Sequence, residues 1–208
     1  MQTPERVDMQ SYARRAHFDY FRNMANPYVG VTVNVEITAF LRAVKSKKLP
    51  FFLSFLYRVA GAANAVPELR ERIEGEGIVR YAYCPTSHTV ARPDGTYGYC
   101  TLDARLPFET YLADAVQKQT SAQRGAGLSE DGDAQSLLFI STVPWFSYTS
   151  LLQPTPSPAD SNPRITWGKF FAQGEQALMP VTLLCHHALV DGRHIGLFFE
   201  ALGEGLKI

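Results

Sequence analysis

The sequence predicts an α/β fold, an α+β two-layer sandwich in which helices cover a mixed β-sheet. Residues 28–37 alternate between apolar and polar side chains, which is the pattern of a strand with one buried face. Two helical segments follow this strand, and short strands recur between residues 78 and 102. The last apolar strand, near residue 181, runs into an amphipathic C-terminal helix. Strands interspersed with such helices pack as a sheet with a helical layer, and we treat residues 1–208 as a single domain.

Composition excludes several classes of function. A hydrophobic content of 46% with 12% aromatic residues suits a substantial core and argues against disorder. Lys plus Arg and Asp plus Glu both total 20, so no net charge favours nucleic acid or an anionic membrane as a partner. Apolar runs such as 51–56 are too short to span a bilayer. Residues 1–6 lack the apolar core of a signal peptide, and the three cysteines are odd in number and widely spaced. We therefore expect a cytoplasmic protein.

The first third of the chain contains one strand and three helices. Residues 9–22 mix basic and aromatic side chains and predict a short helix. Val29, Val31, Val33 and Val35 form the apolar side of the strand at 28–37. Thr38 then has the character of a helix N-cap. Pro50 opens a more apolar helix, residues 51–66, which we expect to be largely buried.

The middle of the chain is rich in strands, and His88 is interpreted as a structural residue of an exposed strand. Pro93-Asp94-Gly95 forms a turn because proline fixes one φ and glycine accepts a positive one. The remaining expected elements are strands at 78–83, 88–91, 97–102, 137–143 and 163–170, an amphipathic helix at 107–123, an acidic loop at 125–135 and a Pro/Ser-rich surface loop at 153–162.

The stretch from Val181 to Gly192 is the strongest candidate for chemistry. If residues 181–187 form a strand, alternation directs His187 to the same face as Cys185 and directs His186 to the opposite face. A histidine at the end of an apolar strand is partly desolvated, which favours the neutral imidazole that a general base requires. The structural alternative is that the histidines are simply hydrogen-bonded and that Asp191 caps the following helix.

Three further motifs accompany the pattern His186-His187-x-x-x-Asp191-Gly192. They are Arg14-Arg15-Ala16-His17-Phe18, Ile140-Ser141-x-x-Pro144-Trp145 and Pro163-x-Ile165-Thr166-x-x-Lys169-Phe170. The first pattern resembles the HHxxxDG signature of acyl-coenzyme A dependent acyltransferases. The four motifs together resemble the chloramphenicol acetyltransferase family, over about residues 9–202 and in the same order.

This resemblance implies the roles of five catalytic residues. His187 would be the general base, and Ser141 would stabilise the oxyanion of the tetrahedral intermediate. Arg14 would form a buried ion pair with Asp191 that holds the loop orienting the histidine, and Thr166 would help to bind the intermediate. Removing one partner of a buried pair typically costs about 3–5 kcal/mol.

The resemblance also implies the positions that bind the two substrates. The expected coenzyme A contacts are Thr166, Lys169, Phe170 and Trp145, while Pro50 stands where the family has a further lysine, which Lys47 or Lys48 could replace. The expected acceptor-pocket positions are Phe21, Val29, Tyr97 and Phe139. Of these, Tyr97 keeps an aromatic residue of the family's pocket. The other three depart from the family, since Phe21 replaces a tyrosine, Val29 a phenylalanine and Phe139 an asparagine.

The implied reaction is direct transfer of an acetyl group from acetyl-CoA, as co-substrate, to a hydroxyl of chloramphenicol. No tightly bound cofactor, metal, nucleic acid or membrane partner is expected, and the family resemblance implies a homotrimer with active sites at subunit interfaces. One alternative is an acetyltransferase of this fold that acts on a different hydroxylated small molecule. A second is a non-catalytic trimeric binding protein. A zinc hydrolase is disfavoured because HExxH is absent and the two histidines point to opposite faces.

Overall fold

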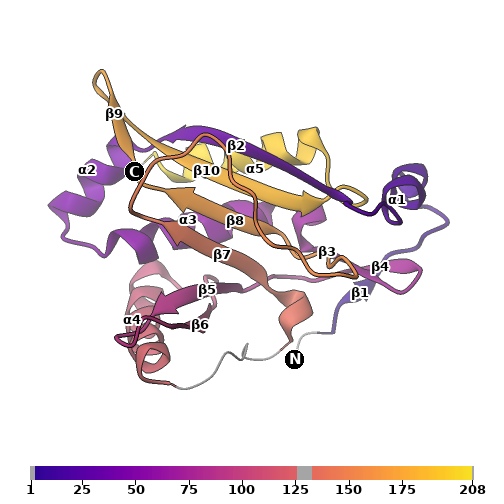
Figure 1. The fold of residues 1–208 in the computed structure, drawn as a ribbon, viewed down its shortest axis with the longest axis horizontal. Coiled ribbons are helices and arrows are strands. Elements are labelled where there is room, and N and C mark those ends of the chain that lie inside the picture. Colours follow the sequence, from indigo (N-terminus) through magenta and orange to yellow (C-terminus); the bar gives the residue numbers. More distant parts are fainter. Residues whose placement is uncertain (1–2, 126–132, 208) are drawn as a thin grey trace.

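The computed structural model describes residues 3–125 and 133–207, and it confirms the predicted α/β fold of a mixed sheet with a helical layer (Figure 1). The elements, in chain order, are β1 (Glu5–Arg6), α1 (Arg15–Phe21), β2 (Tyr28–Glu36), α2 (Thr38–Ser46), α3 (Phe51–Ala65), η1 (Pro67–Arg70), β3 (Glu71–Glu74), β4 (Gly77–Arg80), β5 (Thr86–Ala91), β6 (Tyr97–Leu102), α4 (Phe108–Arg124), η2 (Ala134–Ser136), β7 (Leu138–Val143), β8 (Arg164–Gly168), β9 (Phe171–Gln173), β10 (Gln176–His186) and α5 (Gly192–Gly205).

The main sheet has seven strands in the order β2-β10-β8-β7-β5-β6, and β9 pairs with β10 outside this path. The pairs β5–β7 and β7–β8 are parallel and the others are antiparallel, which makes the sheet mixed. A smaller sheet, in the order β1-β4-β3, lies at one end. The sequence did not predict β1 or β3.

The helices cover one face of the main sheet because the apolar positions of its strands point that way. In β10, Val181, Leu183 and Cys185 are buried on this face. Helix α3 is the centre of the layer, since Phe55, Leu56 and other buried positions wrap most of its circumference, as its composition predicts. Figure 1 shows α3 and α5 behind the sheet.

The opposite face of the sheet carries polar side chains and is crossed by one long connection. Residues 144–163, between β7 and β8, run over β8, β10 and β2 on the side away from the helices (Figure 1). The paired positions Ser141, Thr166, Thr182 and Thr32 form a row of hydroxyls across four strands of this face. This open face is therefore the part of the sheet that is available for ligands.

Two local predictions were wrong. Thr38 is the first helical residue of α2 rather than its cap, since its backbone N–H donates to Oε1 of Glu36 and its hydroxyl accepts from the N–H of Ala177. His88 is buried, not exposed, because its side of β5 packs against the helical layer, and Phe52 lies against its ring. Of the predicted acidic loop at 125–135, residues 126–132 lie outside the described residues.

Two buried histidines make the stability of the fold sensitive to acid. Burial lowers the pKa of His88 to about 4, against a hydrogen bond to the backbone of Cys100 that raises it. Burial also lowers the pKa of His186 to about 4, aided by His187 and opposed by Asp160. Because the unfolded pKa is about 6.5, the unfolded chain takes up protons first, and stability present above that pH is lost as the pH falls towards 4.

We therefore expect the free energy of unfolding to fall between about pH 6.5 and pH 4, by about 1.4 kcal/mol per pH unit for each of these imidazoles. Urea denaturation at a series of pH values measures this slope. A His88→Gln variant should have a shallower slope, whereas His17→Gln, at an exposed position of α1, should retain that of the parent. Equal slopes in all three proteins would contradict the assignment.

Among the described helices, none combines the length and the apolar character needed to cross a membrane.

Candidate active site

His187 lies directly after β10, and its ring is held in one orientation. Its Nδ1 is 2.9 Å from the carbonyl oxygen of Val190. Because a carbonyl oxygen only accepts, Nδ1 carries the proton, and the lone pair of the neutral ring is on Nε2. The backbone N–H of His187 donates to the carbonyl of Pro27 at 2.7 Å, which fixes the chain at this point. The side chain is half-buried, so Nε2 is a positioned acceptor near the surface.

Aromatic packing further restricts the His187 ring. The ring of Phe21, on α1, lies 3.9 Å from it between centroids at an interplanar angle of 30°. Val29 pairs with Cys185 at this end of the sheet, and its side chain packs against the core. Two of the four predicted acceptor-pocket positions, Phe21 and Val29, are therefore at the histidine end of the molecule.

The predicted ion pair between Arg14 and Asp191 is present in the structure. Nη1 of Arg14 bonds Oδ2 of Asp191 across 177 residues of sequence, with side-chain exposures of 17% and 31%. Asp191 is also the N-cap of α5, since Oδ1 accepts from the N–H of Arg193. Asp191 therefore both pairs with Arg14 and caps α5. Burial acts to raise the pKa of Asp191, but the hydrogen bond from Arg14 and the nearby His194 outweigh it and lower the pKa.

The sequence interpretation missed the role of His194 beside this pair. His194 completes a capping box at the start of α5, with Nδ1 3.2 Å from the N–H of Asp191 and 2.9 Å from Oδ1 of Asp191. Its Nε2 lies 3.7 Å from Oε1 of Glu68 on η1. The spacing of three residues from the cap was visible in the sequence, whereas the contact with Glu68 depends on the tertiary fold.

Asp191→Asn is expected to lower both stability and turnover, because asparagine can still cap α5 but removes the charge that faces Arg14. Among the described residues, Asp191 is the one acceptor that reaches the Arg14 guanidinium. Since both side chains are partly exposed, the free energy of unfolding should fall by about 1–3 kcal/mol, less than for a fully buried pair. Chemical denaturation and steady-state assays measure the two effects.

Asp19→Asn is the matched control, because Asp19 pairs with Arg15 on the exposed side of α1. Such a surface pair contributes about 0–1 kcal/mol. If Asp191→Asn were as stable and as active as the parent, Asp191 would be only a helix cap.

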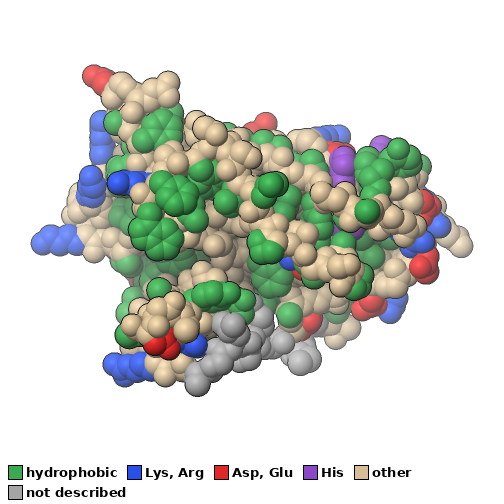
Figure 2. All heavy atoms as spheres, in the orientation of Figure 1, with side chains coloured by type: hydrophobic (Ala, Val, Ile, Leu, Met, Phe, Trp, Pro, Cys, Tyr) green, Lys and Arg blue, Asp and Glu red, His purple; other side chains and the backbone are tan. Residues whose placement is uncertain are grey.

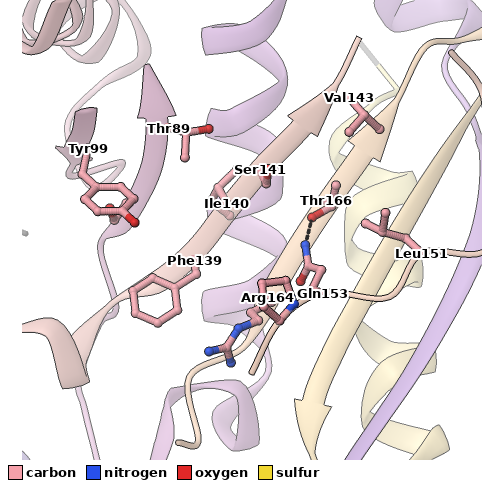
Figure 3. Close-up of a pocket in the computed structure, with 12 residues that line it drawn as sticks. Thr89, Tyr99, Phe139, Ile140, Ser141, Val143, Leu151, Gln153, Arg164 and Thr166 are labelled. Atoms are coloured by element: carbon pink, nitrogen blue, oxygen red, sulfur yellow. Dashed lines mark hydrogen bonds between the residues drawn. The ribbon is translucent and has the colours of Figure 1, made fainter. Parts of the chain in front are cut away.

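Ser141 and Thr166 lie side by side at a cavity on the open face of the sheet. They are register partners on β7 and β8, and both line a cavity of about 390 Å³ (Figure 3). Phe139, two residues before Ser141, and Arg164, two residues before Thr166, line the same cavity. The guanidinium of Arg164 lies 5.4 Å from the centre of the Phe139 ring and pairs with Asp160 at 2.7 Å.

The long connection between β7 and β8 supplies two polar residues that the sequence interpretation did not identify. Nε2 of Gln153 bonds the hydroxyl of Thr166 (Figure 3). The hydroxyl of Tyr148 donates to the carbonyl of Thr166 at 2.8 Å and accepts from the hydroxyl of Thr182 at 3.1 Å. These contacts hold the connection onto the sheet. Only the polar composition of the loop pointed to them.

Three of the four predicted coenzyme A residues, Trp145, Lys169 and Phe170, line a second, larger cavity of about 1000 Å³ together with Ser141. The fourth, Thr166, lines the smaller cavity instead, and Tyr97, predicted for the acceptor pocket, lines the larger one. Trp145 is 76% exposed. Figure 2 shows hydrophobic side chains gathered over this open face, with most Lys and Arg side chains towards its edges. Neither Lys47 nor Lys48, the candidates for the missing lysine, lines this cavity.

One chain does not bring His187 and Ser141 together. Ser141 aligns through Thr166 with Thr182 of β10, five residues before His187. With about 3.3 Å per residue along a strand and about 4.8 Å between strands, the two catalytic candidates are roughly 19 Å apart. His187 lines neither of the cavities that contain Ser141.

The sulfur and metal chemistry of the site is limited. Cys185 is fully buried on the helical face, and burial raises the pKa of its thiol, so it is unsuited to act as a nucleophile. Among the described residues, no group of three His, Cys, Asp or Glu side chains could hold a metal ion.

Known proteins with similar sequences and structures share this arrangement of elements. The family model described as chloramphenicol acetyltransferase matches residues 3–203. Chloramphenicol acetyltransferases from Klebsiella sp. and Proteus mirabilis are 30% and 29% identical to this chain, over 95% of it and over 91% and 92% of their own lengths. A solved chloramphenicol acetyltransferase superposes with a TM-score of 0.85 and 25% identity, covering 99% of this chain and 100% of the other.

A more distant likeness extends to dihydrolipoamide acetyltransferase of Azotobacter vinelandii. That structure has a TM-score of 0.69 and 18% identity, with coverage of 100% of this chain and 91% of the other, which shows a shared fold alone. Because the family model covers nearly the whole sequence, the enzyme class follows from the family. The chain belongs to the chloramphenicol acetyltransferase family.

Proposed function

We propose that this protein transfers an acetyl group from acetyl-CoA directly to a hydroxyl of chloramphenicol, with His187 as general base and Ser141 as oxyanion donor. The observation that carries the proposal is the hydrogen bond between Nδ1 of His187 and the carbonyl of Val190. It leaves the Nε2 lone pair as the proton acceptor. Membership of the chloramphenicol acetyltransferase family supports the same reaction.

His187 performs two proton transfers in the proposed reaction. Nε2 takes the proton of the acceptor hydroxyl while the hydroxyl oxygen attacks the thioester carbonyl. When the tetrahedral intermediate collapses, the carbon–sulfur bond breaks and the imidazolium returns the proton to the leaving thiolate. The packing of Phe21 and the pairing of Asp191 with Arg14 keep the ring in position throughout. The transfer is direct, and Cys185 is not its nucleophile, since burial raises the pKa of its thiol.

Ser141 stabilises the developing negative charge, and Thr166 helps to bind the tetrahedral intermediate. A hydroxyl donor aimed at the oxyanion stabilises it most in a site from which water is excluded. Ser141 lines both cavities, which suits a residue at the junction of the acyl donor and the acceptor. Thr166 is buried beside Ser141. Within the single chain, its hydroxyl accepts a hydrogen bond from the side-chain amide of Gln153.

We infer that the reacting site contains two subunits of a homotrimer. The separation of roughly 19 Å between His187 and Ser141 within one chain is too large for a shared substrate. His187 of one subunit would then face the cavity of its neighbour that contains Ser141. The exposed Trp145, Phe146 and Leu152 of the β7–β8 connection provide apolar surface for such an assembly.

The residues of the acceptor pocket give weaker support for chloramphenicol as the acceptor than the rest of the site gives for acetyl transfer. Phe139 and Arg164 both line the smaller cavity, and Arg164 is paired with Asp160. The second candidate function is therefore acetyl transfer by the same residues to a different hydroxylated small molecule that fits this cavity. A non-catalytic trimer is disfavoured, because Arg14 still engages Asp191 and Ser141 lines an open cavity.

A thiol-release assay with acetyl-CoA separates these functions. Release that requires chloramphenicol supports the proposal, and release only with another alcohol from a panel supports the alternative acceptor. An absence of release with every alcohol, although coenzyme A binds, supports a binding protein.

A further inference from the structure

Gln153 extends from the connection between β7 and β8 into the smaller cavity, where Ser141 and Thr166 lie side by side (Figure 3). Its Nε2 donates a hydrogen bond to the hydroxyl oxygen of Thr166. A hydroxyl has one hydrogen to donate and two lone pairs that accept. Because the amide occupies a lone pair of this oxygen, the hydroxyl hydrogen of Thr166 is directed away from Gln153 and can be donated to another group.

A ring contact five residues earlier in the chain fixes the connection over Thr166. A Cβ atom at Gly168 would lie 2.9 Å from Cδ1 and Cε1 of Tyr148 and 3.0 Å from the carbonyl oxygen of Phe146. The tyrosine ring can therefore rest on β8 only because residue 168 has no side chain. The Tyr148 hydroxyl also donates to the backbone carbonyl of Thr166 at 2.8 Å. The connection is thus anchored to the strand that carries Thr166, which gives Gln153 a defined place beside it.

The neighbouring hydroxyl on the open face has a different partner. Thr182 is the register partner of Thr166 on β10. Its hydroxyl donates to the hydroxyl of Tyr148 at 3.1 Å and lies 2.8 Å from the hydroxyl of Thr32. The hydrogen of Thr182 is therefore used on Tyr148, and the group that orients the Thr166 hydroxyl is the amide of Gln153.

The second polar atom of the Gln153 amide is buried at a cost. Among the described residues, no donor reaches Oε1 of Gln153. A buried polar atom without a partner destabilises a fold, and natural proteins tolerate such conflicts mainly at functional sites. The unpartnered oxygen therefore indicates that the amide is held in place for its contact with Thr166 rather than for the stability of the connection.

We propose that Gln153 is a positioning residue of the acetyl transfer, whose amide directs the Thr166 hydroxyl hydrogen towards the tetrahedral intermediate. Thr166 then acts as a hydrogen-bond donor beside Ser141, and Gln153 acts through Thr166 without touching the reacting atoms. This inference rests on the proposed function, which assigns Thr166 to the intermediate. Donation by the amide also polarises the Thr166 O–H bond, so the hydroxyl becomes a stronger donor for the negative charge of the transition state.

Steady-state kinetics with both substrates varied separates this role from a structural one. Gln153→Ala is expected to lower turnover about tenfold at nearly unchanged KM, as for the loss of one hydrogen bond that acts in the transition state. Gln153→Glu preserves the size of the side chain but presents only acceptors at neutral pH. It should turn the hydrogen of Thr166 towards the carboxylate and lower turnover further than Gln153→Ala. Gln173→Ala, at an exposed position of β9, is the control and should retain the parent turnover.

A double-mutant cycle tests whether Gln153 acts through Thr166. Thr166→Val preserves the shape of the side chain, removes its hydroxyl and should lower turnover by about 10²-fold. Gln153→Ala added to Thr166→Val should cause no further loss, because the hydroxyl that the amide orients is absent. A further loss of about tenfold in this background would show that Gln153 supports only the connection, and would overturn the proposal.

Two results with the single variants would also overturn the proposal. One is a turnover of Gln153→Ala within about twofold of the parent, or above it. The other is a Gln153→Glu protein as active as the parent, because an acceptor facing Thr166 would then suffice. In both cases the parent still transfers acetyl groups, so the proposed function stands. A parent that releases no thiol from acetyl-CoA with any alcohol would overturn the proposed function and this inference together.

Discussion

His187→Ala is expected to lower turnover by about 10²–10⁴-fold or more while the affinity for coenzyme A survives, because the variant lacks the base for the acceptor hydroxyl. The lost group is the Nε2 lone pair that the Val190 hydrogen bond leaves available. Steady-state thiol release and calorimetric binding of coenzyme A measure the two quantities. The affinity should persist because the larger cavity is lined by residues of other segments.

His17→Ala is the matched control, since His17 is exposed on α1 and outside both cavities. Its turnover should equal that of the parent. Retained activity in His187→Ala would remove the general base from the mechanism and leave the His186-His187 pair as structural residues.

Ser141→Ala should lower turnover by about 10²–10³-fold, because one hydrogen-bond donor to the oxyanion is lost. The KM values for both substrates should change little, since the hydroxyl interacts with charge that develops only in the transition state. A full kinetic analysis with both substrates varied makes this distinction. Ser147→Ala, at an exposed position of the β7–β8 connection, is the control. A rise in KM at unchanged turnover would assign Ser141 to ground-state binding.

Much of the fold was predictable because its signals are local. Alternating valines defined β2, and the apolar circumference of the segment after Pro50 defined α3. The edges of elements were less predictable. The sequence predicted a cap at Thr38, but the side chain of Glu36 accepts the first helical N–H instead. The sequence predicted an exposed strand at His88, yet the helices pack on its side of the strand.

The candidate site was predictable only where a motif lies within one segment. His187 and Asp191 are close in sequence, and family resemblance predicted the contact of Asp191 with Arg14. Gln153 reaches the smaller cavity from a segment without a motif, so its contact with Thr166 depends on how the β7–β8 connection lies over the sheet. The distance between His187 and Ser141 could not be anticipated from spacing, because it depends on the register of three strands.

The proposed trimer makes a claim that single-site variants do not test. Each active site would combine His187 of one subunit with Ser141 of its neighbour. A His187→Ala subunit would then retain an intact Ser141 side of the interface, and a Ser141→Ala subunit would retain an intact histidine. In a ring of mixed subunits, some interfaces pair the two intact halves.

Subunit mixing is therefore the most direct test of the account. His187→Ala and Ser141→Ala chains, each nearly inactive alone, are refolded together in equal amounts, and thiol release is measured with chloramphenicol and acetyl-CoA. Random assembly should restore about a quarter of the parent activity, since one interface in four has both intact halves. Activity no greater than the sum of the two separate variants would show that His187 and Ser141 do not meet across a subunit boundary.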